Sequence, residues 1–475
     1  MTQLEPVIGL EIHVQLATRT KMFCGCELSF GEEPNTRTCP ICLGHPGVLP
    51  VTNAEAVHYG LMIGMALGCE IAPRSIFHRK NYFYPDLPKG YQISQYDIPL
   101  CGAGKLGDVR IHRVHLEEDA AKLVHAGESG RIHGAAGSVV DFNRGGTPLV
   151  EIVTEPDIND PAAAADWLRL LRATLKRLGV SDVNMEEGSL RCDGNVSVRP
   201  VGSTELGVKT ELKNMNSFRF LQRGIEAEIA RQTALIESGG RVEQETLHFD
   251  PATGALSSLR SKEEAHDYRY FPEPDLAPLA PTPEMVERAR TALPELPAAR
   301  AERMEREFGL TADTAHLLAF RGELGDYYEA VVEAGGDGAD SKAIANWVTG
   351  DLVARIGEDD PAESKLTPAA MADLIRMVGA KEVAQAAARE VLGVLVADGG
   401  EPAVIVAERG LGMADSGDLA EVVARAMEQN ADAVEKIKAG NDKAIGAIIG
   451  AVMKETQGRA DGGEVQRLVR EAIGN

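Results

Sequence analysis

The sequence predicts an α+β protein in which a large domain built on antiparallel sheet precedes a helical region. Residues 9–16 and 190–199 alternate apolar and polar side chains with the period of a strand. After the proline-rich stretch 270–283, which suggests a domain junction, apolar residues recur at helical spacing, most clearly at 443–456. Strands in the first half and helices in the second are the pattern of an α+β fold.

Length and charge narrow the class of protein. A chain of 475 residues exceeds the size at which a single core stops growing, so we expect several domains. The net charge of -23 opposes indiscriminate binding to nucleic acid or to an anionic membrane. The sequence has no apolar run that could span a bilayer and no secretory leader, which predicts a cytoplasmic protein without membrane contact. The odd number of cysteines, seven, argues against a disulfide framework.

The first alternating segment, 9–16, places Glu11, His13 and Gln15 on one face of a strand and apolar residues on the other. A carboxylate beside an imidazole can hold a metal ion or move a proton. The same pair can also lie in water on the exposed face of an antiparallel sheet. This strand alone does not decide between these alternatives.

Four cysteines form a close cluster in the sequence. Cys24-Gly-Cys26 and Cys39-Pro-Ile-Cys42 are two thiolate pairs separated by twelve residues, as a tetrahedral zinc site requires. Because four thiolates complete the coordination shell, the pattern predicts a structural zinc ion. Free cysteines or a redox pair are the alternatives.

Acidic residues mark two further segments. Glu117, Glu118 and Asp119 are consecutive, and like charges raise one another's pKa unless a cation neutralises them. A buried run would therefore imply a metal, whereas an exposed run would be a solvated turn. In the second alternating segment, Asp193 shares a face with Arg191, which favours a functional carboxylate face.

Two loops carry groups suited to nucleotides. A Gly-Gly turn can bring backbone N–H groups to a phosphate, or it can simply connect a hairpin. This turn consists of Asn143, Arg144, Gly145, Gly146 and Thr147. Lys80 and the aromatic residues 82–84 suit a nucleotide or a nucleic-acid end, although such aromatics also pack loops. The G-x-G-x-x-G match at 102–107 is discounted, because a strand follows it where a dinucleotide fold needs a helix.

Helical signals follow in order. Asp160 and Pro161 mark the start of a helix with apolar residues at helical spacing. Another helix follows Ser416, and a glycine-containing boundary near 398–400 separates a middle helical domain from a small tail. From 430 to 475, seven basic residues balance seven acidic ones, which fits an RNA-facing module or an ordinary solvated surface.

Eight motifs in one order resemble the B subunit of the heterotrimeric aspartyl/glutamyl-tRNA amidotransferase. They are Gly9–Leu16, Arg79–Pro85, Tyr91–Gln95, His115–Asp119, Gly146–Val153, Met185–Asp193, Glu211–Phe218 and Asp267–Asp275. Val452–Lys454 and Gly458–Ala460 extend the resemblance into the tail, so that it covers essentially the whole chain. So many long motifs in one order are not expected by chance.

The resemblance implies three domains. Residues 1–294 would form a cradle-shaped catalytic domain similar to glutamine synthetase and guanidino kinases, with a four-cysteine zinc knuckle at 24–42. Residues 295–398 would form an all-α helical domain. Residues 399–475 would form a small helical tail that resembles the YqeY family and binds tRNA.

The resemblance also implies a reaction in two steps. ATP phosphorylates the side-chain carboxylate of Glu on tRNA(Gln), or of Asp on tRNA(Asn), and ammonia then displaces the phosphate. Phosphoryl transfer between two anions needs divalent metal and cationic groups around the γ-phosphate. An acyl phosphate also needs shelter from water, which a deep cradle provides.

By the resemblance, one set of residues would bind magnesium or manganese and the phosphates. This set is Glu11, His13, Glu117, Glu118, Glu151 and Asp193. Lys80, Arg191 and Lys213 are expected to offset negative charge or to line the route of ammonia. Magnesium prefers oxygen ligands, so His13 either indicates manganese or binds the metal through water.

The nitrogen must come from another chain, because this sequence has no Ser- and Gly-rich amidase signature with a catalytic lysine. The resemblance implies a heterotrimer with a glutaminase A subunit and a small C subunit, acting on misacylated tRNA. A non-catalytic, zinc-containing tRNA-binding protein is the alternative. A stand-alone ATP-dependent amide ligase is a third hypothesis.

Overall fold

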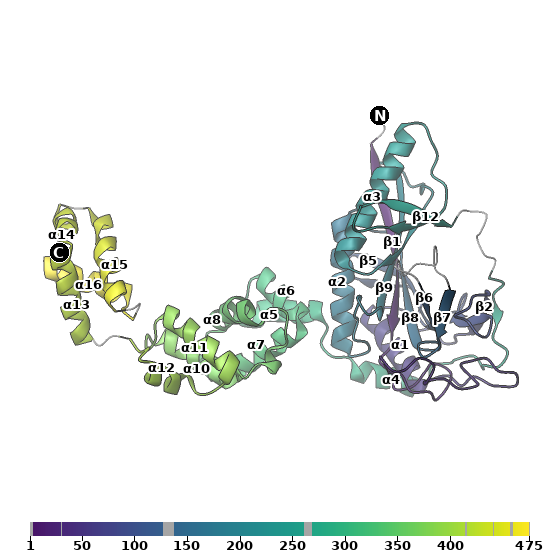
Figure 1. Cartoon of the computed structure of the whole chain (residues 1–475), viewed down its shortest axis with the longest axis horizontal. Coiled ribbons are helices and arrows are strands. Elements are labelled where there is room, and N and C mark those ends of the chain that lie inside the picture. Colours follow the sequence, from purple (N-terminus) through teal and green to yellow (C-terminus); the bar gives the residue numbers. More distant parts are fainter. Residues whose placement is uncertain are drawn as a thin grey trace. The chain divides into compact units, whose positions relative to one another are not determined.

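The protein is described from a computed structural model and forms two compact units, Met1–Leu296 and Pro297–Asn475 (Figure 1). The structure describes residues 3–29, 31–126, 137–260, 268–413, 416–439, 441–456 and 459–474. Asp267 and Gly458, which belong to motifs quoted above, lie outside these residues. The division falls beyond the proline-rich stretch 270–283, which is therefore part of the first unit and not the junction.

An eight-stranded, mainly antiparallel sheet forms the centre of the first unit, in the order β12-β11-β10-β9-β1-β8-β5-β4. The strands are β1 (Leu4–Gln15), β4 (Gly104–Leu106), β5 (Val109–Glu118), β8 (Pro148–Thr154), β9 (Leu190–Pro200), β10 (Thr210–Met215), β11 (Thr246–Phe249) and β12 (Leu256–Arg260). The predicted strands at 9–16 and 190–199 are β1 and β9, and they pair with each other at the middle of the sheet. The discounted glycine motif at 102–107 lies at the β4–β5 hairpin, as expected from the strand that follows it.

Helices cover the apolar face of this sheet. Leu10, Ile12 and Val14 of β1 are at most 1% exposed and share one core with residues of α1 (Ala54–Ala66), α2 (Pro161–Leu178) and α3 (Phe218–Glu237). Helix α2 begins as predicted, because the Asp160 side chain accepts a hydrogen bond from the backbone N–H of Ala163 at 2.8 Å. Helix α4 (Pro283–Ala292) packs against α1. Because the apolar side chains of β1 are buried on this face, the polar side chains of β1 lie on the opposite face of the sheet.

Two smaller sheets complete the unit. Strands β2 (Phe77–Asn81), β3 (Tyr91–Gln95) and β13 (Phe271–Pro272) form a three-stranded sheet, so the proline-rich stretch contributes an edge strand. Strands β6 (Lys122–Ala126) and β7 (Gly137–Asp141) pair as a ribbon. Strand β3 packs on β5, which places the small sheet beside the polar face of the large one.

The second unit is helical and has two separate apolar cores. The first core is built from α5 (Pro297–Phe308), α6 (Ala312–Phe320), α7 (Gly322–Gly335), α8 (Ser341–Asn346), α9 (Val353–Ile356), α10 (Pro368–Gly379), α11 (Gln385–Asp398) and α12 (Pro402–Arg409). The second is built from α13 (Ser416–Gln429), α14 (Ala431–Lys438), α15 (Ile445–Glu455) and α16 (Gly462–Ile473). The predicted helices after Ser416 and at 443–456 are α13 and α15.

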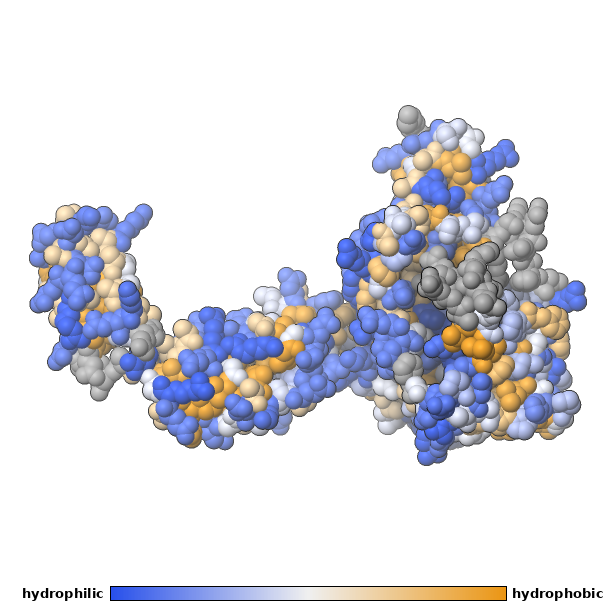
Figure 2. Space-filling model, viewed as in Figure 1, coloured by the Kyte–Doolittle hydropathy of each residue, from blue (hydrophilic) through white to orange (hydrophobic). Residues whose placement is uncertain are grey.

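One boundary in this unit differs from the sequence analysis. Helix α12 was expected in the tail that begins at 399, but its Ile405 and Val406 are buried in the first helical core. The glycines at 399 and 400 end α11 without ending that core, because the chain turns there and α12 packs back on α10 and α11. Hydrophilic side chains cover much of the visible surface of this unit (Figure 2). None of the helices in the described ranges combines the length and apolar composition that a membrane crossing needs.

Candidate functional site

The polar face of the large sheet carries a row of ionisable side chains across four neighbouring strands. Strand register places His13 of β1 directly opposite Glu151 of β8 on one side and Arg191 of β9 on the other. Glu151 is in turn opposite His115 of β5. Directly opposed residues of antiparallel strands point to the same face. The row His115, Glu151, His13, Arg191 is therefore fixed by backbone pairing alone.

Two further rows flank the first. Glu11 is directly opposite Asp193, whose carboxylate accepts a hydrogen bond from Lys213 Nζ of β10 at 2.7 Å. On the other side, Asp119 accepts hydrogen bonds from Gln15 Nε2 at 2.8 Å and from Arg191 at 2.9 Å. Residues far apart in the sequence thus meet on one face of the sheet.

His13 is the centre of this cluster. Its Nε2 atom lies 3.4 Å from a carboxylate oxygen of Glu151 and 3.7 Å from oxygens of both Glu117 and Glu11. Two sets of ligand atoms lie within 4.8 Å of one another, Glu11 with His13 and Asp193, and His13 with Glu117 and Glu151. Both sets share His13. Either set has the donor types and the spacing that a divalent cation requires.

A second layer holds these carboxylates in place. Glu151 is contacted by Arg113 at 3.1 Å and by His115 Nε2 at 3.4 Å. Glu117, only 2% exposed, accepts a hydrogen bond from the Ser94 hydroxyl at 3.0 Å. The small sheet, which contributes Ser94 from β3, therefore helps to orient a carboxylate of the large sheet.

Burial and neighbouring charges shift the pKa values of the groups in this cluster in different directions. Burial alone would lower the pKa of His115, but Glu151 and Glu117 outweigh it and raise this pKa to about 9. In the opposite sense, burial would raise the pKa of Glu151, but His115 and His13 hold it well below its usual range. Burial, reinforced by the charge of Glu151, raises the pKa of Glu11. Positive charge from imidazolium groups thus stabilises a site that is also suited to a metal cation.

Lys80 supplies a cation on the small sheet. Its ammonium group lies 4.9 Å from the centre of the Tyr268 ring. Burial disfavours the charged form of Lys80, but Glu117, Tyr270 and Glu151 outweigh this effect and raise its pKa. Strand β2, which carries Lys80, pairs with β3, whose Ser94 donates to Glu117 of the carboxylate cluster.

Glu118 does not join that cluster. Because successive side chains of a strand point to opposite faces, Glu118 is directed away from Glu117, and its carboxylate pairs with Lys89 and with the backbone N–H of Ile93. It lines a cavity of about 200 Å³ beside Cys42. The expected role of Glu118 as a metal ligand at this site is therefore wrong, whereas its neighbour Glu117 lies where that role requires.

The turn 143–147 is also not the phosphate loop that its composition suggests. The backbone N–H groups of Asn143, Gly145, Gly146 and Thr147 donate to Asp141, Phe142, Asp119 and Arg144. The Arg144 side chain donates to the backbone oxygens of Ala120 and Ala121 at 3.0 and 2.8 Å. These donors are used within the protein, so the expectation that the turn binds a cofactor is not supported. The turn 143–147 instead fixes the backbone of Asp119, because Gly146 donates to the backbone oxygen of Asp119 and the Asp119 N–H donates to Thr147.

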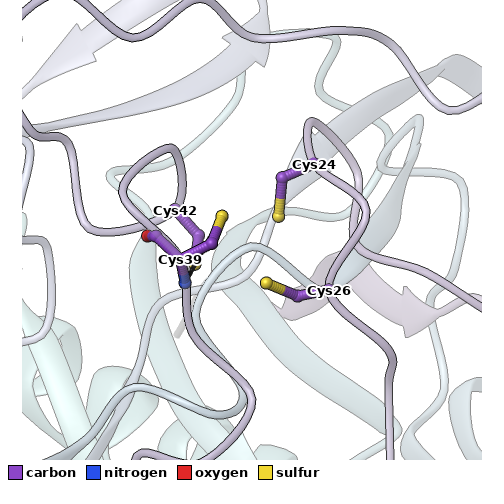
Figure 3. A group of neighbouring side chains, drawn as sticks. All are labelled: Cys24, Cys26, Cys39 and Cys42. Carbon is purple, nitrogen blue, oxygen red and sulfur yellow. Dashed lines mark hydrogen bonds between the residues drawn. The ribbon is translucent and has the colours of Figure 1, made fainter.

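The four cysteines converge as their spacing predicts (Figure 3). The sulfurs of Cys24, Cys26, Cys39 and Cys42 all lie within 4.8 Å of one another, with Cys39 and Cys42 3.9 Å apart. None of them is in a disulfide. A tetrahedral zinc ion with Zn–S bonds of about 2.3 Å requires sulfurs roughly 3.8 Å apart, so this arrangement fits zinc.

The cysteine cluster is linked to the turn beside the carboxylate site. Lys21, 1% exposed, lies 3.7 Å from the Cys42 sulfur and donates to the backbone oxygen of Phe142 at 3.1 Å. Asn143 accepts a hydrogen bond from the backbone N–H of Arg37 at 2.8 Å. Gly146, with φ of 87°, has an ideal Cβ position 3.3 Å from Lys21 Cδ, so this tight passage favours glycine.

Several residues of the candidate site were missed in the sequence. His115 and Arg113 received no role, although both have the same strand parity as Glu117, and Asp119 was considered only as a member of the acidic run 117–119. The alternation of side chains along this strand could therefore have placed His115 and Arg113 on the face that carries Glu117. The contacts of Asp119 with Gln15 and Arg191 depend on strand register and could not be read from local pattern.

Fold and site together define a class of protein: an antiparallel-sheet domain that gathers carboxylates, imidazoles and cations on one face, followed by helical domains. Residues 6–287 match the GatB/GatE catalytic domain family, and residues 326–473 match the family described as the GatB domain. The second match begins within α7, so it includes part of the first helical core and the whole of the second.

Full-length relatives agree with these matches. Proteins named as the B subunit of aspartyl/glutamyl-tRNA(Asn/Gln) amidotransferase from Anaeromyxobacter sp. (strain Fw109-5) and Brevibacillus brevis are 48% and 47% identical, over 100% of this chain and 99% of each relative. The protein of that name from Thermodesulfovibrio yellowstonii is 48% identical over 99% of this chain and 98% of its own length. The chain belongs to the family of amidotransferase B subunits, as its motifs predicted.

Proposed function

We propose that this chain activates and amidates the amino acid carried by a misacylated tRNA. In the first step, a side-chain carboxylate oxygen of glutamate on tRNA(Gln), or of aspartate on tRNA(Asn), attacks the γ-phosphorus of ATP. The bond from this phosphorus to the bridging oxygen breaks, and ADP leaves. In the second step, ammonia attacks the acyl carbon, inorganic phosphate leaves, and the nitrogen loses a proton. The product is an amide, so the chain would be part of a glutamine-hydrolysing carbon–nitrogen ligase.

The observation that carries this proposal is the carboxylate and imidazole cluster around His13. Glu11, Glu117, Glu151 and Asp193 offer the oxygen ligands that magnesium prefers, and His13 adds a nitrogen that manganese accepts more readily. Such a cation, held here, would offset the negative charge of the phosphates. A non-catalytic tRNA-binding protein does not account for four acids and two histidines converging on one sheet face.

The cations beside the cluster have separate tasks in this proposal. Arg191, fixed by Asp119, lies in the same row as His13 and can bind a phosphoryl or carboxylate oxygen. Lys213, between Asp193 and Glu211 at 2.7 Å from each, holds the Asp193 carboxylate in its orientation. Lys80 adds positive charge from the small sheet. Phosphoryl transfer depends mainly on such positioning and electrostatic stabilisation.

The zinc site has a structural role in this proposal. Four thiolates leave no open coordination position, so zinc there performs no chemistry. Through Lys21 and Asn143 it would brace the turn 143–147, which in turn supports Asp119.

The wider assembly is inferred from the family. The names of the relatives describe one subunit of an amidotransferase, and we propose a glutaminase A subunit as the source of ammonia and a small C subunit as a brace. We further propose that the first unit is a cradle related to glutamine synthetase and guanidino kinases, which shelters the acyl phosphate from water. The helical tail would bind tRNA. A non-catalytic tRNA-binding protein would need only the cysteines and the tail.

The test is amidation of Glu-tRNA(Gln) by the chain reconstituted with its A and C subunits. Glu151→Gln and Asp193→Asn are expected to lower turnover at least about hundredfold, because each removes a charge at the phosphoryl-transfer site. The matched control is Glu155→Gln, which changes a partly exposed acid four residues beyond Glu151 that pairs with His112. Unchanged turnover in the two site variants would refute the proposal.

A further inference from the structure

Two tyrosines from the outer strands of the small sheet form an exposed aromatic stack. Tyr96 directly follows β3 and Tyr270 directly precedes β13, on either side of the middle strand β2. Their rings are nearly parallel, at 8°, with centroids 4.3 Å apart. Although Tyr270 covers one side of its ring, Tyr96 remains 57% exposed. Much of the Tyr96 ring is therefore open for another flat group to stack on it.

Ion pairs hold the chain on both sides of the stack. Arg79 of β2 donates to both carboxylate oxygens of Glu273, at 2.7 and 2.8 Å, and so fixes the chain just beyond Tyr270. Asp97, directly after the other tyrosine, lies 3.1 Å from Nε2 of His78, which also belongs to β2. A surface that is held in place before binding loses little conformational freedom when a ligand stacks on it.

The stack lies on the side of the small sheet that meets the carboxylate cluster. His78 is directly opposite Ser94, and Lys80, two residues further along β2, points to the same side. The Ser94 hydroxyl donates to Glu117 of the cluster at 3.0 Å. Tyr96 is two residues beyond Ser94, about 7 Å further along the chain. Its ring centroid lies 6.3 Å from that of His78, which places the ring on this side of the sheet.

A third tyrosine connects the stack to a cation. The rings of Tyr270 and Tyr268 have centroids 6.1 Å apart. The ammonium group of Lys80 lies 4.9 Å from the centre of the Tyr268 ring. An aromatic surface with a cation beside it suits a nucleotide, because the base stacks while the phosphates are anionic. An apolar side chain of a partner protein would need no such cation.

We infer that Tyr96 and Tyr270 form a platform on which an adenine base stacks; this inference rests on the proposed function. Two substrates of that reaction carry adenine, namely ATP and the 3′-terminal adenosine of tRNA, whose ribose bears the amino acid. In each of them the reacting group is joined to the base through a ribose. Stacking on Tyr96 holds the base while the γ-phosphate or the side-chain carboxylate reaches the cluster around His13.

The experiment measures binding to the chain assembled with its A and C subunits, by titration calorimetry. One arm compares ATP with ribose triphosphate, which lacks the base. The other compares tRNA(Gln) with tRNA(Gln) whose 3′-terminal nucleotide is abasic. In one arm the wild type should bind the ligand with adenine about fivefold to a hundredfold more tightly, the range for stacking one base on an aromatic ring. Tyr96→Ala should lose this difference, and the arm in which it does so identifies the substrate.

Two variants separate stacking from folding. Tyr96→Phe keeps the ring and should keep the wild-type difference between ligands with and without adenine. Leu259→Ala, which shortens a side chain that is 51% exposed on β12, should keep it as well.

Three results would overturn the inference alone. The wild type could bind ligands with and without adenine equally in both arms, or Tyr96→Ala could keep the wild-type difference. Tyr96→Ala could also weaken the binding of both ligands equally, which would indicate a structural role for the stack. Because these measurements need no turnover, an assembly whose binding of adenine depends on Tyr96 but which does not amidate Glu-tRNA(Gln) would refute the proposed function alone.

Discussion

The substitution Glu117→Gln tests which of two adjacent acids, Glu117 or Glu118, belongs to the proposed metal site. The two side chains point to opposite faces of β5. Glu117 Oε1 lies 3.7 Å from His13 Nε2, and Oε2 accepts a hydrogen bond from Ser94. Two unit charges about 4 Å apart interact by about 4 kcal/mol at an effective dielectric constant of about 20. Substitution by Gln removes this interaction with a bound cation, and the remaining ligands and water recover part of it. We therefore expect binding of Mn²⁺ to weaken at least about hundredfold, or roughly 2.7 kcal/mol.

The assay is calorimetric titration of the full-length chain with Mn²⁺, checked by the electron paramagnetic resonance of the bound ion. Glu118→Gln is the matched control, since it changes the next residue and removes a carboxylate that pairs with Lys89 on the other face. It should bind Mn²⁺ as the wild type does. The reasoning is refuted if Glu117→Gln keeps wild-type affinity, or if the loss occurs in Glu118→Gln instead.

Three further predictions concern stability. In the metal-free chain, protonated His115 stabilises the folded state below pH 6.5, and this stability is lost as the pH rises through about 9. The melting temperature should therefore fall across that window in the wild type and fall less in His115→Gln, where His13 still has a raised pKa. Cys39→Ser should lose the bound zinc, measured by elemental analysis, and its melting temperature should be lower by about 5 °C. An unchanged zinc content would contradict the four-cysteine site. Arg300 is 1% exposed and pairs with Asp326 and Glu329. Substitution of Arg300 by Ala should lower the free energy of unfolding by about 3 kcal/mol, measured by urea denaturation. An unchanged midpoint would show that these ion pairs do not contribute to stability.

Strand parity explains how much of the site could be predicted from sequence. Glu11 and His13, and likewise Asp193 with Arg191, were placed on shared faces because side chains alternate with a period of two residues. The same rule, applied to β5, would have separated Glu118 from Glu117. Val114 and Leu116 are buried in the core, and Glu118 has their parity.

Other features depend on contacts that no local pattern encodes. The turn 143–147 has the composition of an anion-binding loop, but its N–H groups donate to Asp119, to residues 141 and 142 just before the turn, and to Arg144 within it. Helix α12 follows two glycines, yet Ile405 and Val406 pack into the preceding core. Glycines mark where a chain can turn, and the destination of the next helix depends on which apolar surface is available.

The transfer of oxygen tests the central claim most directly. Glu-tRNA(Gln) is prepared with ¹⁸O in the side-chain carboxylate and given to the reconstituted assembly with ATP and glutamine. If the carboxylate attacks the γ-phosphorus and ammonia then displaces phosphate, the released phosphate carries one ¹⁸O atom per amide formed. With Glu151→Gln in this chain, label should appear in phosphate at a rate lower by at least about a hundredfold. Amide formation by the wild-type assembly without ¹⁸O in the phosphate would contradict the account.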